Sequence, residues 1–378
     1  YAHLPENVEN VALIVRTAAV HDDNPEIIRA RELGIPIMER AEAWGSVMRD
    51  YHNVICLSGT HGKTTTTSMM SLIAMHAQLP AIGGTLRIGG KDCFVAESCE
   101  YCNSFLSFAP TVAVILNVEA DHLDFFKDLD DIIHSFHEFC LRTPEDGLVV
   151  VNADDANAMR AVQGVNRKVL TFGTQSTADV YPEHITIENG YYSFDVMVHG
   201  EKYAAVRLSV PGRHNMLNAL AACAVSFYLE LDGVRVAEGL NAFTGSSRRF
   251  QRTGKMPCGA LVVDDYAHHP SEMRATLTAA REMKFDRIIC AFQPHTYTRT
   301  KALLDEFADA LCLADRVVLA DIYAARETDT LGVSSEDLRE KVAARGTQAW
   351  YFSTFDEIEN FLLENCIPGD LLITMGAG

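Results

Sequence analysis

A strand, a glycine-bracketed turn and a helix follow one another in NVICLSGTHGKTTTT, residues 53–67, and this segment constrains the fold most. The apolar run ends at a turn between Gly59 and Gly62, and we expect a helix to begin near Lys63. Several backbone N–H groups then point into one concavity, where the helix dipole adds positive charge. The segment therefore predicts a phosphate-binding loop. A threonine-rich helix start with an exposed lysine, the alternative, leaves the two glycines unexplained.

Within this loop, Lys63 is expected to reach the outer phosphates, and the hydroxyl of Thr64 stands where Mg²⁺ needs a hard oxygen ligand. Four consecutive β-branched residues form a poor helix by propensity alone. The helix is therefore expected to depend on packing and on a bound ligand, with Thr66 and Thr67 assigned to packing.

Carboxylates and an imidazole follow two further apolar runs. DCFVAES leads into Glu97 and Glu100, and TVAVILN is followed closely by Asp121 and His122. In open α/β sheets ligands bind at the carboxyl ends of the strands, so these side chains predict a magnesium–nucleotide site beside the loop. The histidines of HSFHEF, residues 134–139, lack this setting and are assigned to helix packing.

Apolar runs and helical patterns alternate along most of the chain, which predicts an α/β protein with parallel sheets. Asn24 and Gly34 are placed to begin and end an early helix. Residues 184–210 instead alternate polar and apolar around an Asn-Gly turn and predict a small antiparallel side sheet. Five strands after a junction at RRFQRTG predict a doubly wound domain. The predicted domains are 1–51, 52–246 and 247–378.

Composition excludes several classes of protein. No apolar run reaches the roughly 18–20 residues of a membrane span. A net charge of −19 without a basic patch disfavours nucleic acid as a partner. Scattered single cysteines indicate a reducing cytoplasm, and the pair Cys99 and Cys102 is interpreted as incidental thiols, with metal or redox use as the alternative. Both chain ends look cut, and the oligomeric state stays open.

The chain resembles the Mur ligase family over essentially its whole length. The motifs that carry the resemblance occur in order and are GTHGKTTTT, VAESCEYCNSF, NVEADHLD, PGRHNMLNALAA, SRRFQ, DDYAHHPSE and FQPHTYTRTKAL. The resemblance implies an incomplete N-terminal Rossmann-like unit for a UDP-sugar, a central P-loop ATPase domain and a C-terminal Rossmann-like domain. It also implies ATP-dependent joining of L-alanine to the lactyl carboxylate of UDP-N-acetylmuramate, through an acyl phosphate, in peptidoglycan synthesis.

Family roles transfer to matching positions of this chain. The resemblance assigns the ATP phosphates to Gly59, Thr60, His61, Gly62, Lys63, Thr64 and Thr65, and magnesium to Thr64, Glu100 and His122. It assigns the adenine side to Asn215 and Asn218, and contact with the nucleotide on closure to Arg249 and Asp265. His268, His295 and Arg299 resemble the groups around the muramate carboxylate and the incoming alanine, and either histidine is a candidate relay for the amine proton.

Departures from the family pattern leave rival interpretations open. The glycine-rich turn that holds the UDP moiety in relatives would precede residue 1, and Thr296 stands where many relatives carry arginine. A ligase that joins UDP-muramate to a ready-made tripeptide shares most of these motifs. Folylpolyglutamate synthetase is a more distant enzyme rival, and a non-catalytic nucleotide-binding relative is the alternative from another class.

Overall fold

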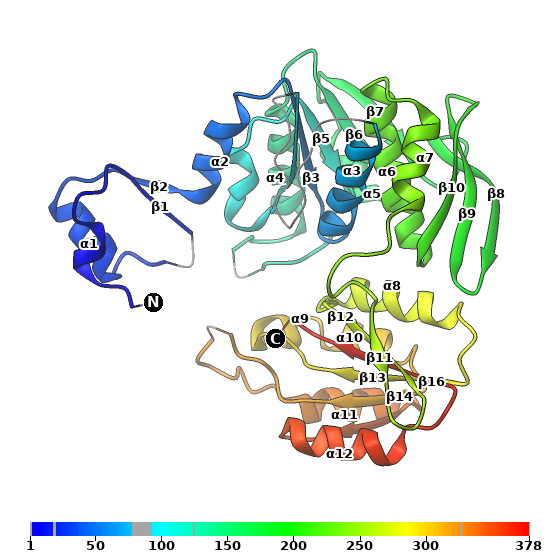
Figure 1. The fold of residues 1–378 in the computed structure, drawn as a ribbon. Helices are drawn as coiled ribbons and strands as arrows, with labels where there is room; N and C mark the ends of the chain where they lie inside the picture. Colours follow the sequence, from blue (N-terminus) through cyan, green and yellow to red (C-terminus); the bar gives the residue numbers. More distant parts are fainter. Residues whose placement is uncertain (1, 18–19, 78–91, 124, 326, 378) are drawn as a thin grey trace.

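The computed structural model describes residues 2–17, 20–77, 92–123, 125–325 and 327–377. These residues form three successive groups of elements, each with its own sheet, which we call the N-terminal unit, the central domain and the C-terminal domain (Figure 1). The predicted α/β class is confirmed. No helix within the described ranges is long and apolar enough to cross a membrane.

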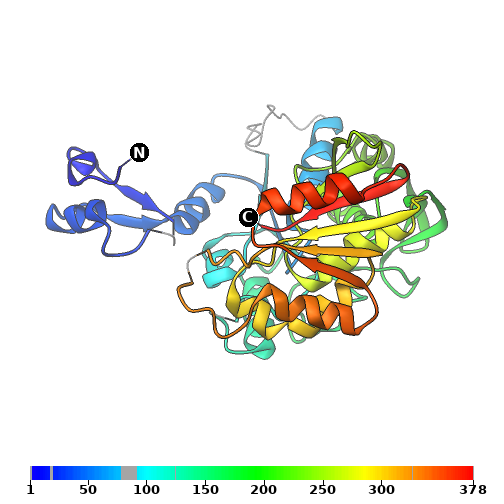
Figure 2. The same cartoon turned by 90° about the horizontal axis from the view of Figure 1, so that it is seen from below.

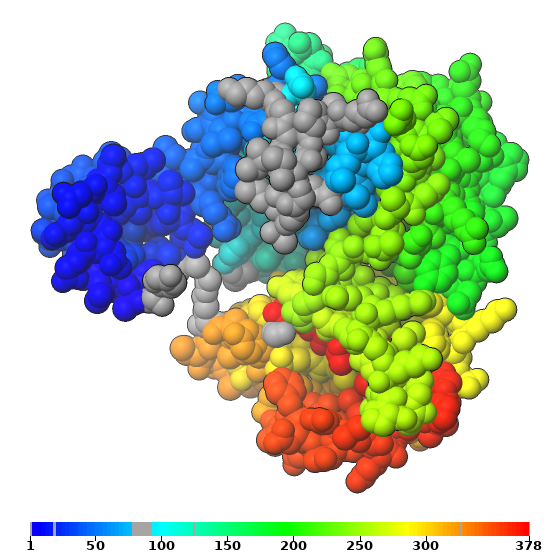
Figure 3. Space-filling model, viewed as in Figure 1, coloured from blue at the N-terminus to red at the C-terminus, as the bar shows by residue number. Residues whose placement is uncertain are grey.

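The N-terminal unit is small and projects from the other two domains (Figure 3). Its two strands pair in parallel, beginning with Ile14 opposite Ile37. Asn24 caps the first α-helix as predicted, because its side-chain oxygen accepts a hydrogen bond from Glu26 N. Gly34 has a positive φ of 68° just beyond that helix. The elements are η1 (Pro5–Val8), β1 (Ile14–Arg16), α1 (Pro25–Glu32), β2 (Ile37–Glu39) and α2 (Arg40–Met48).

The central domain is built on an eight-stranded sheet of order β10-β9-β8-β7-β6-β5-β3-β4. Strands β3 to β7 are parallel, as their continuous apolar sequences predict. The elements are β3 (Asn53–Ser58), α3 (Lys63–His76), β4 (Cys93–Glu97), η2 (Tyr101–Ser107), β5 (Val112–Ile115), α4 (Leu129–Leu141), β6 (Leu148–Asn152), α5 (Ala156–Ala161), β7 (Lys168–Phe172), β8 (Val180–Glu188), β9 (Tyr191–Val198), β10 (Glu201–Pro211), α6 (Arg213–Tyr228) and α7 (Gly233–Asn241).

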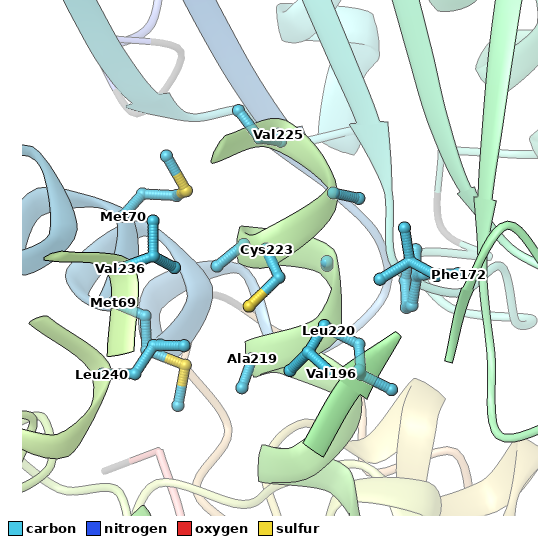
Figure 4. Close-up of a cluster of buried hydrophobic side chains, with 14 of the residues drawn as sticks. Met69, Met70, Phe172, Val196, Ala219, Leu220, Cys223, Val225, Val236 and Leu240 are labelled. Carbon is cyan, nitrogen blue, oxygen red and sulfur yellow. The ribbon is translucent and has the colours of Figure 1, made fainter. Parts of the chain in front are cut away.

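Helices cover the parallel sheet on both faces. On one face α3, α6 and α7 meet in a buried cluster, in which Met69, Cys223 and Leu240 point toward one another (Figure 4). Full burial of each large apolar side chain stabilises the fold by about 1.5–3 kcal/mol. Thr66 is fully buried in this packing, and its hydroxyl donates to Gly62 O over 2.9 Å. The threonine-rich helix therefore depends on packing, as predicted.

The antiparallel meander is confirmed, but it does not form a separate side sheet. Asn189 and Gly190 both have positive φ, as the tight turn between β8 and β9 requires. The first residues of β8 are buried, and Val180 pairs in parallel with Phe172 of β7. The meander thus continues the parallel sheet, because β8 satisfies backbone groups that an exposed β7 edge would leave unpaired.

Helix α4, on the other face of the sheet, carries the histidines that the sequence assigned to packing. His137 is partly buried, and its Nδ1 lies 2.9 Å from Ala161 O, as expected of a packed residue. His134 is exposed, so the packing prediction is wrong for that residue. Phe136, between them, is fully buried, so apolar positions contribute to the packing of this helix.

The C-terminal domain contains a six-stranded sheet of order β11-β12-β16-β13-β14-β15 (Figure 2). Its five predicted parallel strands are confirmed. An antiparallel edge strand, Gln251–Lys255, adds to them where the sequence predicted only a junction; all its residues are exposed, so no apolar pattern marks it. The elements are β11 (Gln251–Lys255), β12 (Leu261–Asp265), α8 (Pro270–Arg281), β13 (Arg287–Phe292), α9 (Tyr297–Ala302), α10 (Leu304–Leu311), β14 (Arg316–Leu319), α11 (Ser335–Ala344), β15 (Gln348–Tyr351), α12 (Phe355–Asn365) and β16 (Asp370–Met375).

Candidate active site

The turn between β3 and α3 requires glycine at both predicted positions. Gly59 has φ of 142°, and a Cβ there would lie 3.0 Å from Leu116 Cβ and 3.1 Å from Asn117 N. Gly62 has φ of 85°, and a Cβ there would lie 2.7 Å from Asn218 Oδ1. The turn is therefore pressed against the end of β5 and the start of α6. Only glycine at these two positions allows the turn to approach β5 and α6 this closely without displacing a neighbouring atom.

Lys63 begins α3, and its ammonium group lies in the concavity of the turn. Its Nζ donates to Gly59 O over 2.5 Å, to Thr60 O over 3.1 Å and to the Glu100 carboxylate over 3.1 Å. Burial acts to lower the pKa of Lys63, but the nearby acidic groups, among which Glu100 contributes most, together outweigh it, so the pKa is raised. The lysine is therefore charged at neutral pH and stands where phosphate charge would collect.

The predicted metal ligands come from three strand ends. The Thr64 hydroxyl donates to Glu97 Oε2 over 2.8 Å, and Glu100 is buried with an exposed fraction of 3%. His122 Nε2 lies 4.0 Å from Glu100 Oε1. The described residues contain no group of three or more His, Cys, Asp or Glu side chains arranged to hold a metal. The hydroxyl and the two carboxylates nevertheless bring hard oxygen atoms to one side of Lys63.

The segment after β5 connects the central and C-terminal domains. Asp121 Oδ1 accepts hydrogen bonds from Arg299 Nη2 over 3.0 Å and from Nε over 3.2 Å. Burial acts to raise the pKa of Asp121, but the charges of Arg299, His122 and His269 together lower it well below its usual range. His122 has a positive φ of 53°, and its ring lies 4.6 Å from that of Tyr101. An ion pair that joins two domains thus borders the predicted histidine.

The imidazole rings of two histidines in the C-terminal domain lie close together. The ring centroids of His268 and His295 are 6.0 Å apart. His268 Nδ1 lies 2.9 Å from Tyr266 O, and burial lowers the pKa of His268. Burial, followed by the charge of Arg299, lowers the pKa of His295 to about 4. Both imidazoles are therefore neutral at pH 7.

A small cavity lies behind the phosphate loop, between the central and C-terminal domains. Its volume is about 60 Å³. The four residues that the resemblance assigned to the adenine side and to closure all line it, and they are Asn215, Asn218, Arg249 and Asp265. Arg249 pairs across it with Glu272, Nη1 to Oε1, over 3.4 Å.

Asp265 is held by its own domain rather than left open to the cavity. Its carboxylate accepts hydrogen bonds from the backbone N–H groups of Phe250 and Ala267, each over 2.8 Å, and from the Thr276 hydroxyl over 3.2 Å. Burial raises the pKa of Asp265 to about 6. The residue thus fixes the two segments that form one wall of the cavity.

A much larger cavity, of about 650 Å³, opens between the segment after β5 and the C-terminal domain. His122, His295 and Arg299 line it, together with Tyr101, Ala120, Asp121, Leu123, Thr296, Thr298, Lys301, Ala302, Leu303, Ala325, Glu327 and Leu331. His268, the remaining predicted residue of this group, is not among the lining residues and lies behind His295. The structure thus places the predicted site residues around two unequal cavities at one domain junction.

Several residues at this junction were missed by the sequence reasoning. His214 lines the small cavity, and burial, with the charges of His61 and Arg249, lowers its pKa to about 4. Glu272 lies beside His268, Nδ1 to Oε2 3.3 Å. The available signals were the position of His214 in PGRHNM and the four-residue helical spacing from His268 to Glu272. None of the ten cysteines, all within described ranges, forms a disulfide.

Comparison with protein families finds three matches along the chain. Residues 1–52 match the Mur ligase family catalytic domain, residues 57–226 match the Mur ligase middle domain, and residues 248–378 match the Mur ligase glutamate ligase domain. Together the three matches account for most of the chain in the order in which the sheets occur.

Individual proteins give the same result. The chain is 50% identical to the UDP-N-acetylmuramate–L-alanine ligase of Agathobacter rectalis, with 100% of this chain and 85% of the relative covered. It is 49% identical to the ligase of the same name from Lachnospira eligens, with 99% and 85% covered. The crystal structure of UDP-N-acetylmuramate–alanine ligase from Thermotoga maritima superposes with a TM-score of 0.81 at 30% identity, covering 100% of this chain and 84% of that one. The chain belongs to the Mur ligase family.

Proposed function

We propose that this protein is an ATP-dependent ligase that joins L-alanine to the lactyl carboxylate of UDP-N-acetylmuramate in peptidoglycan synthesis. The observation that carries the proposal is a series of contacts from the phosphate loop to the large cavity: Lys63 pairs with Glu100, and His122, which lines the cavity, lies 4.0 Å from Glu100. We infer that a carboxylate in that cavity lies next to the outer phosphate of a nucleotide on the loop. Relatives that are 42–50% identical carry this ligase name, which supports the choice of substrates.

The reaction requires activation of a carboxylate, because a carboxylate and an amine do not condense in water at useful rates. One oxygen of the lactyl carboxylate bonds to the γ-phosphorus of ATP while the bond to ADP breaks. The alanine nitrogen then bonds to the carbonyl carbon of this acyl phosphate, and inorganic phosphate leaves. Lys63 stabilises the charge on the transferring group, so the protein contributes positioning and electrostatics.

The nucleotide is assigned to the two sides of the phosphate loop. Residues 59–65 hold the phosphates, and the small cavity with Asn215, Asn218, Arg249 and Asp265 receives the adenine side. Ligand pockets are typically about 300–1,000 Å³, so the small cavity has to widen before a base enters. Separation of Arg249 from Glu272 is the local change that widens it, because this pair spans the cavity.

Magnesium is part of the proposal, and the donor set fits it. The Thr64 hydroxyl and the carboxylates of Glu97 and Glu100 are hard oxygen ligands, and His122 lies beside them. When bound, the ion neutralises charge on the phosphates. Glu100 meanwhile holds the Lys63 ammonium against the loop, which keeps that side chain directed at the phosphates.

The hydrogen bonds favour His268 over His295 as the proton acceptor. A carbonyl oxygen only accepts, so the Nδ1 next to Tyr266 O carries the proton of neutral His268, and its Nε2 is an acceptor. Arg299 Nη1 lies 3.3 Å from His295 Nδ1 and donates to it, so His295 Nε2 carries the proton. We therefore assign the alanine amine proton to His268 and orientation of the substrate to His295 and Arg299.

A phosphate-release assay with ATP, UDP-N-acetylmuramate and L-alanine tests the proposal. We expect release that requires all three substrates, with the amide product confirmed by mass spectrometry. Turnover with the tripeptide L-alanyl-γ-D-glutamyl-meso-diaminopimelate but not with alanine indicates the recycling ligase instead. No release with either acceptor indicates a non-catalytic nucleotide-binding relative.

Two wider assignments belong to the same proposal. The absence of disulfides among the ten cysteines supports the cytoplasm as the location. The domain limits 1–51, 52–246 and 247–378 stay predictions, which limited proteolysis followed by mass spectrometry of the fragments tests.

A further inference from the structure

The segment that follows β5, residues 117–121, holds the phosphate loop along one side, and we call it the connecting segment. Asn117 Oδ1 accepts from His61 N over 2.9 Å, and Asn117 Nδ2 donates to His61 O over 3.0 Å. Thr60 N donates to Asn117 O over 3.2 Å, and Glu119 N donates to Thr60 Oγ1 over 2.9 Å. Four hydrogen bonds from two residues thus set the position of the loop.

The other side of the same segment contacts the C-terminal domain. His269 Nε2 lies 3.3 Å from Ala120 O, and Arg299 is paired with Asp121 as described above. The Glu119 carboxylate lies between the two sides, because His61 Nε2 is 3.4 Å from its Oε1 and His269 Nδ1 is 3.6 Å from its Oε2. One carboxylate therefore lies between an imidazole of the phosphate loop and an imidazole of the C-terminal domain, and it forms an ion pair with His269 when that ring is protonated.

The charge state and burial of these groups suit a bridge. Burial acts to raise the pKa of Glu119, but the hydrogen bond and charge of His61, the hydrogen bond with Ser271 and the charge of His269 together lower it to about 2. The Glu119 side chain is 33% exposed, whereas that of His269 is only 7% exposed. The ionised carboxylate thus sits at the edge of the junction, while its C-terminal partner is enclosed within it.

We propose that Glu119 is a positioning residue that couples the phosphate loop to the C-terminal domain, with His269 as its partner. Seating of the C-terminal domain brings His269 to the carboxylate, which in turn fixes His61 and the turn that holds the phosphates. The inference rests on the proposed ligase function and deepens it, because it makes the geometry of phosphoryl transfer depend on domain seating. Neither residue needs to touch a substrate.

His269 also caps α8, so the variants have to separate this role from the bridge. Its side chain accepts from Ser271 N, and Glu272 completes a capping box. His269→Asn keeps a good capping group but is too short to reach Ala120 O and Glu119. Glu119→Gln keeps size and hydrogen-bonding capacity but removes the charge. Glu145→Gln and His52→Asn, at exposed positions away from the junction, are the matched controls.

A double-mutant cycle on the full chain tests the coupling. The kcat for alanine-dependent phosphate release, the KM for ATP and the melting temperature are measured for the wild type, both single variants and the double variant. We expect each single substitution to lower kcat about tenfold, and the double variant to lose no more, because both remove the same contact. The dissociation constant of a non-hydrolysable ATP analogue for H269N is expected to stay within about twofold of the wild type.

Distinct outcomes separate this inference from the function on which it rests. Alanine-dependent turnover by the wild type is measured first and tests the proposed function. A double variant with about a hundredfold loss, the product of two independent effects, overturns the bridge, as does wild-type kcat in E119Q. If H269N shows no melting transition, it does not fold, and Glu119→Asp alone then tests the inference. The shorter side chain lengthens both contacts of the carboxylate. An unchanged kcat in this variant overturns the inference.

Discussion

The two cavities at the domain junction differ about tenfold in volume, and residues of the phosphate loop line the smaller one. The cavity behind the loop measures about 60 Å³ and is crossed by the Arg249–Glu272 pair. The cavity in front measures about 650 Å³ and is bordered by the Asp121–Arg299 pair. In this one arrangement of the domains, the proposed acceptor side is open, whereas the proposed adenine side is nearly filled.

Both cavities are lined by segments of the central and the C-terminal domain. The central domain contributes the start of α6 to the small cavity and the segment after β5 to the large one. A relative movement of the domains therefore changes both volumes at once. Substitutions that affect one cavity and not the other are the means to test whether the two sides have separate roles.

The largest effect is expected from removing the charged group of the phosphate loop. Lys63→Ala takes away the ammonium that lies in the turn, and we expect alanine-dependent phosphate release to fall about 10³-fold or more. The measurement is kcat for phosphate release, with circular dichroism to verify the fold. Lys127→Ala, at a side chain that is 87% exposed, is the control and is expected to keep wild-type activity. Normal turnover by K63A contradicts the loop assignment.

A smaller effect, on kcat but not on nucleotide binding, is expected from substitution of His268, which lies behind the large cavity. His268→Asn removes the proposed proton acceptor, and general acid–base groups typically contribute about 10²–10⁴ in rate. We therefore expect kcat to fall about a hundredfold while the affinity for a non-hydrolysable ATP analogue is unchanged. Equal losses in both quantities indicate a structural role at the junction instead, because burial of His268 beside Glu272 also shapes the small cavity.

The sequence predicted the parallel strands, the glycine turn and the strand-end side chains because each has a local signal. Gly59 and Gly62 bracket a turn, and Glu100 and His122 follow apolar runs. The edge strand Gln251–Lys255 had no such signal, since its stability comes from pairing with β12 and not from apolar residues.

Contacts between domains were beyond local reasoning for the same physical reason. Asp121 and Arg299 are 178 residues apart, and Glu119 and His269 are 150 residues apart. Nothing in the spacing of such residues indicates which of them meet, because the contact depends on how two separately folded sheets dock. The family resemblance named His268 and Arg299, but it did not supply their partners in the central domain.

A substitution that narrows the small cavity further is expected to affect ATP binding at that cavity only. Gly62→Ala adds a Cβ that would lie 2.7 Å from Asn218 Oδ1 at φ of 85°, so we expect the KM for ATP to rise about tenfold. Gly164→Ala is the matched control, because its φ is 75° but no atom lies within 4 Å of the added Cβ. It is expected to lower stability by about 1 kcal/mol and leave the KM unchanged. A KM for ATP that rises equally in both variants removes the assignment of this cavity.

The smallest expected effect is a shift of the pH profile of activity. Its direction follows from the lowered pKa values of His268 and His295. Burial lowers the pKa of His268 from its ordinary value of 6.5, and the pKa of His295 falls to about 4. A base with a lowered pKa stays neutral, and so active, as the pH falls through 6.5, and is lost only when the pH passes below its own value. The acid limb of kcat/KM for alanine is therefore expected below pH 6.5, whereas a limb at or above that value contradicts the assignment of a buried histidine base. Behind the loop the sign is opposite: burial raises the pKa of Asp265 to about 6, so this carboxylate takes up a proton at a higher pH than His295 does. Measuring KM for ATP across the same range therefore reports on the small cavity, whereas kcat/KM for alanine reports on the two histidines.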